Sequence, residues 1–260
     1  MRALVTRPEP EARTLARGLE GLGLKVVIEP MLEIVPRAPE GDALGGDAPG
    51  GDAPEGDAPE GGIALEGLQA VLVTSANGAR ALARATERRD IPVFAVGRES
   101  GRAAREVGFG TVEEAGGDVT ALARLVSDTL DPAKGALLHA AGADLAGDLR
   151  GVLEARGFTM RRQVLYEARA ASALSAGLRA ALAGGGIDLA LFFSPRSAGT
   201  FVSLLRGAGL ASASARIHAF CLSAAVAGAL EGLSWRRVWI APRPEQDALL
   251  ATVDRALESL

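Results

Sequence analysis

The sequence predicts an α/β protein of two similar lobes, each built on a parallel sheet, with a two-stranded β hinge joining them. The main observation is a repeat: an apolar run of strand length ends at a serine and enters an alanine-rich helical pattern at 70–80 and again at 189–199. A second matching pair of strand, turn and helix follows at 93–104 and 217–228. Strands that alternate with helices are typical of parallel sheets. The duplication favours two lobes with a cleft between them.

The hydrophobic periodicity places the elements in order. The chain is expected to open with a strand at 2–7, a helix at 11–22, a strand at 25–28 and an extended segment at 31–36. The middle of the chain predicts strands at 68–73, 93–96, 110–113, 135–139 and 160–166, with helices from 75 to about 86 and at 100–107, 119–130 and 143–156. The last third predicts strands at 187–193, 217–222 and 237–240, with helices after Ser197 and at 224–231 and 246–257.

The domain organisation follows if the opening strands complete the sheet of the last third. We predict a discontinuous first lobe of residues 1–33 and 172–260, a second lobe of residues 64–163, and antiparallel hinge segments at 31–37 and 164–171. Residues 41–62 repeat a Gly-Asp-Ala-Pro unit. This composition cannot bury enough apolar area to offset the entropy of ordering, so we predict a flexible surface insertion there.

Composition excludes several classes of protein. No apolar run approaches the roughly 20 residues that span a bilayer, so no membrane association is expected. The amino terminus lacks the features of a secretory signal, and Cys221 is the only cysteine, which together favour the cytoplasm. The net charge of −4 and the few aromatic residues argue against nucleic acid. Two histidines and one cysteine make a metal centre improbable.

Polar turns follow the predicted strands and should lie at the carboxyl edges of the sheets, where helix N-termini bind anions. The candidate substrate-binding residues in these turns are Thr6, Arg7, Ser75, Ala76, Asn77, Gly97, Arg98, Ser100, Ala140, Ala141, Gly142, Ser194, Pro195, Arg196 and Ser223. For each serine the alternative is an ordinary helix N-cap, and for each arginine a solvated surface charge. A structural role is favoured for His139 and His218, and a packed position for Cys221.

A set of short motifs, in order along the chain, resembles the uroporphyrinogen-III synthase family. The motifs lie at 3–8, 72–78, 95–97, 164–166, 192–195 and 243–249, and the resemblance covers nearly the whole chain except 41–62. Each motif alone is weak, and their order and spacing carry the resemblance. The segment from Cys221 to Ser223 departs from the family, in which a Gly-Pro or Gly-x-Thr turn is common.

The resemblance implies two α/β lobes and a hydro-lyase that needs no cofactor and no metal. The family cyclises and dehydrates the linear tetrapyrrole hydroxymethylbilane to uroporphyrinogen III, with inversion of the last pyrrole ring. By similarity, Tyr166 falls on the tyrosine that assists departure of the hydroxyl, and Ser75, Ser100, Ser194 and Ser223 match hydroxyl or turn positions. A monomer and a transient contact with hydroxymethylbilane synthase are also expected.

Two other classes of function remain open from the sequence. One is a two-lobed domain that binds or senses a small anion without chemistry. The other is a nucleotide-sugar or NAD enzyme, which would require a phosphate-binding loop. Neither a dinucleotide fingerprint nor a phosphate-loop lysine is present, and no Gly-x-Ser-x-Gly motif marks a nucleophilic serine.

Overall fold

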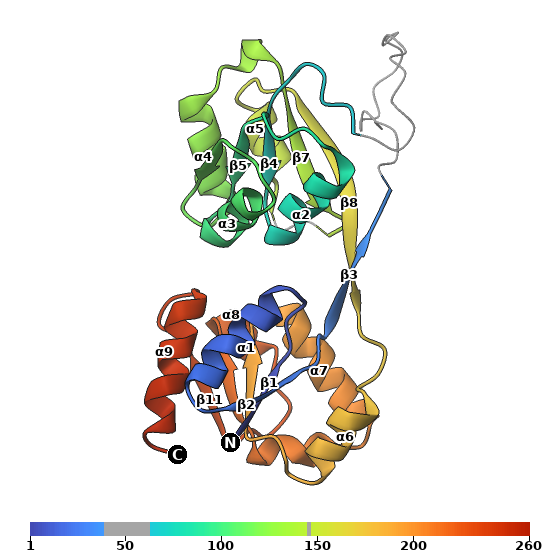
Figure 1. Cartoon of the computed structure of the whole chain (residues 1–260), viewed down its shortest axis with the longest axis vertical. Coiled ribbons are helices and arrows are strands. Elements are labelled where there is room, and N and C mark those ends of the chain that lie inside the picture. Colours follow the sequence, from blue (N-terminus) through green and yellow to red (C-terminus); the bar gives the residue numbers. More distant parts are fainter. Residues whose placement is uncertain (39–62, 145–146) are drawn as a thin grey trace. The chain divides into compact units, whose positions relative to one another are not determined.

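The computed structural model describes residues 1–38, 63–144 and 147–260. The predicted insertion at 41–62 therefore lies outside the described residues. The chain divides into two compact units (Figure 1). The first unit combines Met1–Glu33 with Arg169–Leu260, and the second unit is Ile34–Ala168.

The first unit contains a five-stranded sheet in the order β11-β10-β9-β1-β2. All four neighbouring pairs are parallel. The strands are β1 (Arg2–Val5), β2 (Lys25–Ile28), β9 (Leu189–Phe192), β10 (His218–Cys221) and β11 (Arg237–Ile240). The opening strands of the chain thus complete a sheet that is otherwise made by its last third.

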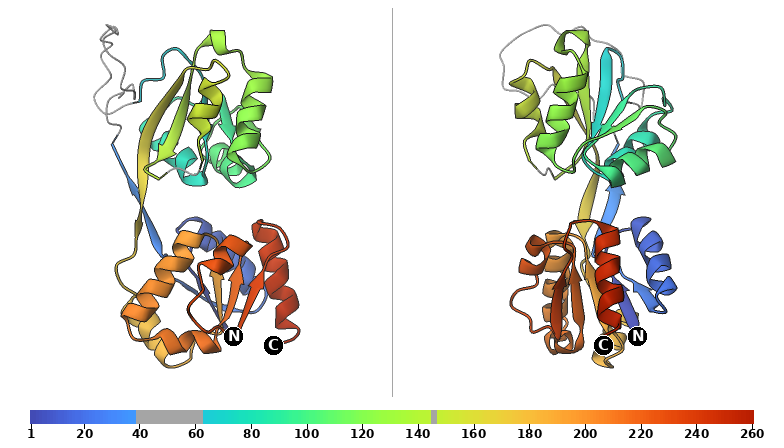
Figure 2. Two further views of the ribbon diagram at one scale, coloured as in Figure 1. Left: turned by 180° about the vertical axis from the view of Figure 1, so that it is seen from behind. Right: turned by 90° about the vertical axis from the view of Figure 1, so that its left-hand side faces the viewer.

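Helices cover both faces of this sheet (Figure 2). Leu4 of β1 packs in the core that contains α6 (Ala176–Ala183), α7 (Pro195–Gly207) and α8 (Ala224–Gly228). Its neighbours Ala3 and Val5 pack in the opposite core, beneath α1 (Glu11–Gly21) and α9 (Gln246–Leu257). Because successive side chains of a strand point to opposite faces, a strand buried on both faces must be apolar throughout. This explains the uninterrupted apolar runs of β1 and β9.

The second unit contains a six-stranded sheet in the order β3-β8-β7-β4-β5-β6. Its strands are β3 (Leu32–Pro36), β4 (Leu68–Val73), β5 (Val93–Ala95), β6 (Val112–Glu114), β7 (Ala136–Gly142) and β8 (Met160–Ala170). The pairs from β8 through β7, β4 and β5 to β6 are parallel.

The second sheet is also covered on both faces. Val71 and Val73 of β4 pack with α2 (Ala76–Ala85) and α3 (Arg98–Glu106), while Ala70 and Leu72 pack with α4 (Val119–Thr129) and α5 (Leu149–Glu154). Short 3-10 helices lie at Pro132–Lys134 in this unit and at Ala211–Arg216 in the first. Both units are therefore α/β/α sandwiches, and the predicted fold class is confirmed.

The chain crosses between the units along β3 and β8, which pair as a two-stranded ribbon. The Ala171 N–H donates to the Met31 carbonyl at 3.0 Å, and the Arg37 N–H donates to the Leu165 carbonyl at 2.9 Å. As the chain advances along β3, its partners on β8 run backward. The pairing is therefore antiparallel, as the sequence predicted.

Several local predictions differ from the structure. Residues 140–142 form the end of β7 and not a turn, because β8 continues to pair with them after the pairing with β4 has ended at His139. The helix predicted from Ser100 begins at Arg98, and the helix predicted at 143–156 is limited to α5. Helix α6 was not predicted, although its N-cap Ser175 accepts a hydrogen bond from the Leu178 N–H at 3.1 Å.

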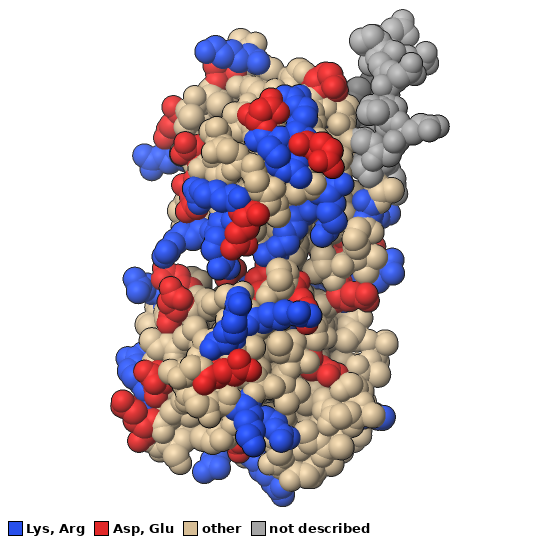
Figure 3. Space-filling model, in the orientation of Figure 1, with Lys and Arg blue, Asp and Glu red and all other residues tan. Residues whose placement is uncertain are grey.

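Charged side chains of both signs are interspersed on the visible face of each unit (Figure 3). The ion pairs among the described residues are mostly local, such as Arg150 with Glu154 one helical turn away. Such exposed pairs contribute little to stability. Within residues 1–38, 63–144 and 147–260, no helix combines the length and apolar character that crossing a bilayer requires. The same ranges hold no cluster of three or more side chains able to bind a metal.

Candidate functional site

The candidate site in the second unit lies at the carboxyl edge of its sheet, where β4 leads into α2 and β5 leads into α3. A helix N-terminus presents unpaired N–H groups and a partial positive charge. Two such N-termini at neighbouring strand ends favour binding of an anionic ligand there. The phenol of Tyr166 in β8, the candidate catalytic residue, also lies at this edge, opposite Gly142 at the end of β7.

Ser75 begins α2 and also contacts Tyr166. Its backbone is extended and its Oγ accepts a hydrogen bond from the Gly78 N–H at 2.9 Å, so it is the N-cap of the helix. The same Oγ lies 2.7 Å from the Tyr166 hydroxyl, and either oxygen can be the donor. Ser75 therefore caps the helix, as the alternative interpretation predicted, and the same oxygen contacts the candidate residue Tyr166.

Gly78 allows α2 to approach β7 closely. A Cβ atom at this position would lie 2.8 Å from the Ala140 carbonyl oxygen, closer than side chains tolerate. Only glycine lets the first turn of the helix rest on the strand at this distance. Gly78 thereby helps to bring Ser75 within reach of Tyr166.

Tyr166 is half-buried and packs against the core beneath α2. Burial raises the pKa of its phenol above the ordinary value of 10.0, and the negative charge of Asp144 adds to this, while the hydrogen bond to Ser75 acts in the opposite direction. The phenol is therefore neutral at physiological pH. A neutral phenol can donate its proton in a hydrogen bond.

His139 lies beneath this edge in β7 and is 5% exposed. Its Nε2 is 3.1 Å from the Thr74 Oγ1. Burial, and to a smaller extent the positive charge of Arg162, lowers its pKa to about 4. The imidazole is thus neutral and enclosed, in agreement with the structural role that the sequence favoured.

The other predicted residues of this unit differ in accessibility. Ala140 and Ala141 are each 1% exposed inside β7, so their side chains cannot meet a ligand.

The predicted residues at the starts of α3 and α2 are more accessible, except for Ser100. Gly97 is the N-cap of α3, and because it has no side chain, no side-chain oxygen at this position accepts a hydrogen bond from the first N–H groups of that helix. Arg98 is exposed at the first position of α3, and Ser100 is buried in its first turn. Asn77 accepts a long hydrogen bond, 3.4 Å, from Arg80, and Ala76 is the first residue of α2.

The first unit has a similar carboxyl edge with different contacts. Thr6 is fully buried and donates its hydroxyl proton to the Leu191 carbonyl at 2.7 Å, so it holds β1 to β9. The Arg7 guanidinium lies 4.4 Å from the centre of the Phe193 ring, and its Nη1 donates to the Gln246 Oε1 at 3.0 Å. Stacking and hydrogen bonding together hold this cation at the edge.

Serines begin the helices of this edge as well. The Ser194 Oγ accepts from the Ser197 N–H at 3.1 Å and caps α7, whose first residue is Pro195. Arg196 follows, exposed, in the first turn. The Ser223 Oγ accepts from the Val226 N–H at 3.4 Å and caps the short helix α8. The predicted capping role is thus present at all three serines Ser75, Ser194 and Ser223.

Two contributors were missed by the sequence reasoning. Arg162 donates from Nη2 to the carbonyls of Gly142 and Ala143 at the end of β7, and Gln246 holds Arg7. Both contacts join residues far apart in the chain. The sequence carried no signal for Arg162, because β8 contains other arginines and its partners are backbone carbonyls.

The fold and these edges define a class of protein: paired parallel-sheet α/β units with capped helix N-termini and cations at the strand ends, suited to an anionic small molecule. More particularly, the chain belongs to the uroporphyrinogen-III synthase family, because the family model described as uroporphyrinogen-III synthase HemD matches residues 13–251.

Solved structures support the fold. The chain is similar to the uroporphyrinogen-III synthetase of Helicobacter pylori, with a TM-score of 0.58, 16% identity and full coverage of both chains. It is also similar to a mutant uroporphyrinogen III synthase of Thermus thermophilus, with a TM-score of 0.51, 17% identity and full coverage of both chains. A search of curated protein sequences finds no match to this chain.

Proposed function

We propose that this chain is a uroporphyrinogen-III synthase, which cyclises and dehydrates hydroxymethylbilane with inversion of the last pyrrole ring. Family membership over residues 13–251 supports the proposal. The observation that carries it within the structure is the contact of 2.7 Å between the Tyr166 hydroxyl and the Ser75 Oγ at a carboxyl edge.

The reaction removes one molecule of water. The hydroxyl of the terminal hydroxymethyl group takes up a proton and leaves, and the pyrrole nitrogen stabilises the cation that remains. A substituted carbon of the last ring attacks this cation to give a spiro intermediate, one bond migrates, and a proton is lost as the macrocycle closes. The enzyme must hold the chain so that this carbon is attacked first, which is catalysis by positioning.

Tyr166 is suited to assist the first step. Its phenol stays neutral because burial raises its pKa, so its proton is available to the departing hydroxyl. Ser75 can donate to the phenol oxygen while it accepts from the Gly78 N–H, since a hydroxyl carries one proton and two lone pairs. In that arrangement the phenol O–H is free to point toward the substrate.

The strand ends are suited to the carboxylates of the substrate. In the second unit we assign this role to the N-termini of α2 and α3, with Asn77, Gly97 and Arg98. In the first unit we assign it to Arg7, Ser194, Arg196 and Ser223. Helix N-termini stabilise nearby anions, and arginine can bind a carboxylate through two parallel hydrogen bonds.

We also propose the cytoplasm as its location and hydroxymethylbilane synthase as its supplier. The only cysteine, Cys221, is fully buried and unpaired, which fits a reducing compartment. The substrate closes spontaneously to the type I ring, so a short transfer from the enzyme that makes it limits this loss.

The decisive experiment incubates the purified protein with hydroxymethylbilane, oxidises the products and separates the uroporphyrin isomers. We expect the type III isomer, with type I alone in the control without protein. If the folded protein yields only type I, the chain binds anions without performing the ring closure.

A further inference from the structure

The pairing of β7 with β8 contains a β-bulge next to the candidate site. The register runs regularly to Ala141 opposite Val164, and then Gly142 lies opposite Tyr166, so Leu165 is the extra residue. Consecutive residues of a regular strand point to opposite faces. Here Leu165 and Tyr166 both pack against the core beneath α2. Bulges re-aim a side chain in this way, and this one directs the phenol toward Ser75.

Gly142 provides the space that the phenol occupies. A Cβ atom on Gly142 would lie 2.8 Å from the Cζ and 2.9 Å from the hydroxyl oxygen of Tyr166. The φ angle of Gly142 is not positive, so alanine can adopt this backbone. Replacement by alanine therefore acts on Tyr166 through steric contact and not through backbone strain.

Arg162 holds the backbone around the bulge. Its Nη2 donates to the carbonyls of Gly142 and Ala143 at 2.9 and 3.1 Å. The Ala143 N–H in turn donates to the Tyr166 carbonyl at 2.9 Å. The Nε of Arg162 is buried and has no hydrogen-bond partner among the described residues. Leaving a charged donor unpaired is costly, so the side chain is held in this position by its other contacts.

We propose that Gly142 and Arg162 are positioning residues for Tyr166: Gly142 leaves room for the phenol, and Arg162 fixes the bulge that aims it at Ser75. The catalytic consequence rests on the proposed function, whereas the placement of the phenol does not. Neither residue need touch the reacting atoms, because both act through Tyr166.

The first test uses the tyrosine itself. Tyr166 is the only tyrosine in the chain, so the absorbance change on formation of tyrosinate reports this side chain alone. Gly142→Ala should expel the phenol from its partly buried place and shift its pKa down toward the ordinary value of 10.0. Gly110→Ala is the matched control, because a Cβ there meets nothing within 4 Å and its φ is not positive. An unchanged titration of Gly142→Ala overturns the proposal.

The second test is kinetic. Gly142→Ala should lower kcat by up to about a hundredfold, as small misplacements of catalytic groups do, with little change in KM. Arg162→Lys keeps the charge, but its shorter side chain does not carry the donors as far as Nη2 reaches, so it should lower both kcat and the Tyr166 pKa to a smaller extent. If Gly142→Ala fails to fold, Arg162→Lys still tests the proposal. A kcat and a Tyr166 pKa equal to those of the wild-type protein would contradict the positioning role of Arg162.

The two tests separate the two proposals. If no variant and no wild-type protein forms the type III isomer, the proposed function fails, but the tyrosine titration still decides the positioning. If the wild-type protein is active and Gly142→Ala matches it in both kcat and tyrosine pKa, the positioning proposal fails alone.

Discussion

The Tyr166 hydroxyl and the Ser75 Oγ lie 2.7 Å apart although 91 positions separate the two residues in the chain. Ser75 is fixed by the N–H of Gly78, and Tyr166 is fixed by the bulge in β8. The contact between the two oxygens thus depends on a helix cap and on a β-bulge. The cap and the bulge can each be changed by a separate substitution.

Removal of the serine hydroxyl tests the pair from the side of the helix. Ser75→Ala should lower kcat by roughly fivefold to tenfold, the effect of one lost hydrogen bond. It should also raise the pKa of Tyr166 further, because the hydrogen bond from Ser75 lowers that pKa. Steady-state kinetics and tyrosine titration measure the two effects.

The loss of a helix cap needs its own control. Ser75→Ala should destabilise the protein by about 1 kcal/mol through the cap alone. Ser175→Ala removes the cap of α6 together with the hydrogen bond from its Oγ to the Glu29 carboxylate, so it too loses a cap and one further contact, but no tyrosine is involved. It should show a similar loss of stability with unchanged kcat. Equal kinetic effects of the two variants would reduce Ser75 to a structural cap.

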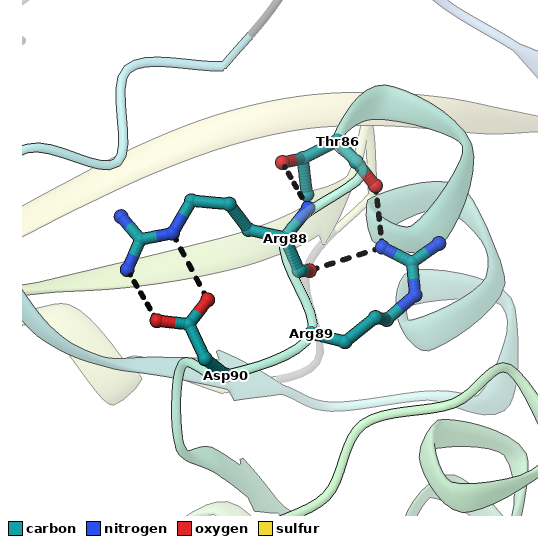
Figure 4. A network of polar contacts seen from close by, with 4 residues as sticks. All are labelled: Thr86, Arg88, Arg89 and Asp90. Carbon is teal, nitrogen blue, oxygen red and sulfur yellow. Dashed lines mark hydrogen bonds and ion pairs between the residues drawn. The ribbon is translucent and has the colours of Figure 1, made fainter.

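Adjacent arginines at the end of α2 have different environments (Figure 4). Arg89 donates to the carbonyls of Thr86, Ala83 and, at the end of α3, Val107, and its guanidinium lies 5.1 Å from the centre of the Phe109 ring. Arg88 instead pairs with Asp90 at 2.8 Å in solvent. Arg89 therefore caps backbone carbonyls at the C-termini of α2 and α3, whereas Arg88 makes only an exposed ion pair.

Alanine replacement should separate these two roles. Arg89→Ala leaves several helix-end carbonyls without a partner and should destabilise the second unit by about 2 kcal/mol. Arg88→Ala, the neighbouring control, should leave stability close to that of the unmodified protein, because exposed pairs contribute little. Urea unfolding followed by far-ultraviolet circular dichroism measures both. Equal losses would contradict the assignment.

The sequence was sufficient for the fold because its information is local and repeated. The apolar run of β4 and the serine after it predict a buried strand and a capped helix without reference to the rest of the chain. The end of β7 could not be predicted in this way. Ala140 and Ala141 are small enough for a turn, and only the pairing with β8 extends the strand to Gly142.

The site could be predicted only in part for the same reason. Ser75 and Tyr166 were named individually, but their contact depends on the one-residue bulge at Leu165, which leaves no mark in the periodicity. The role of Arg162 depends on carbonyls that are 19 and 20 positions away. Such backbone partners carry no side-chain signature.

The buried imidazole of His139 makes the stability of the second unit depend on pH. Its pKa is about 4 in the folded protein and 6.5 when unperturbed. Between these values the unfolded chain binds a proton that the folded chain does not, so stability falls as the pH falls. The loss should reach about 3 kcal/mol at pH 4 relative to neutral pH.

Urea unfolding followed by far-ultraviolet circular dichroism, in the unmodified protein and in a His139 variant, measures this dependence. His139→Gln should flatten the pH dependence of the unfolding free energy between pH 6.5 and about 4. Burial also lowers the pKa of His218, but this histidine belongs to the first unit. Unfolding of that unit is followed separately by the fluorescence of its two tryptophans. A slope that persists unchanged in His139→Gln would assign it to other groups.

The thiol of Cys221 should be unreactive in the folded protein. It is fully buried, and burial raises its pKa to about 12. Because the thiolate is the reactive form, an alkylating reagent should label the native chain only as fast as the first unit opens. Labelling against urea concentration should follow the tryptophan signal. Rapid stoichiometric labelling in buffer would show that the thiol is accessible.

The isomers formed by Tyr166→Phe provide the most direct test of whether this phenol serves the ring closure. The type I ring forms spontaneously, so its share rises whenever the enzyme is slow. At equal protein concentration we expect type III from the unmodified chain, and from Tyr166→Phe a reduced but persistent share of type III. A variant as fast as the unmodified chain would remove the phenol from the mechanism, and type I alone from the unmodified chain would contradict the assigned reaction.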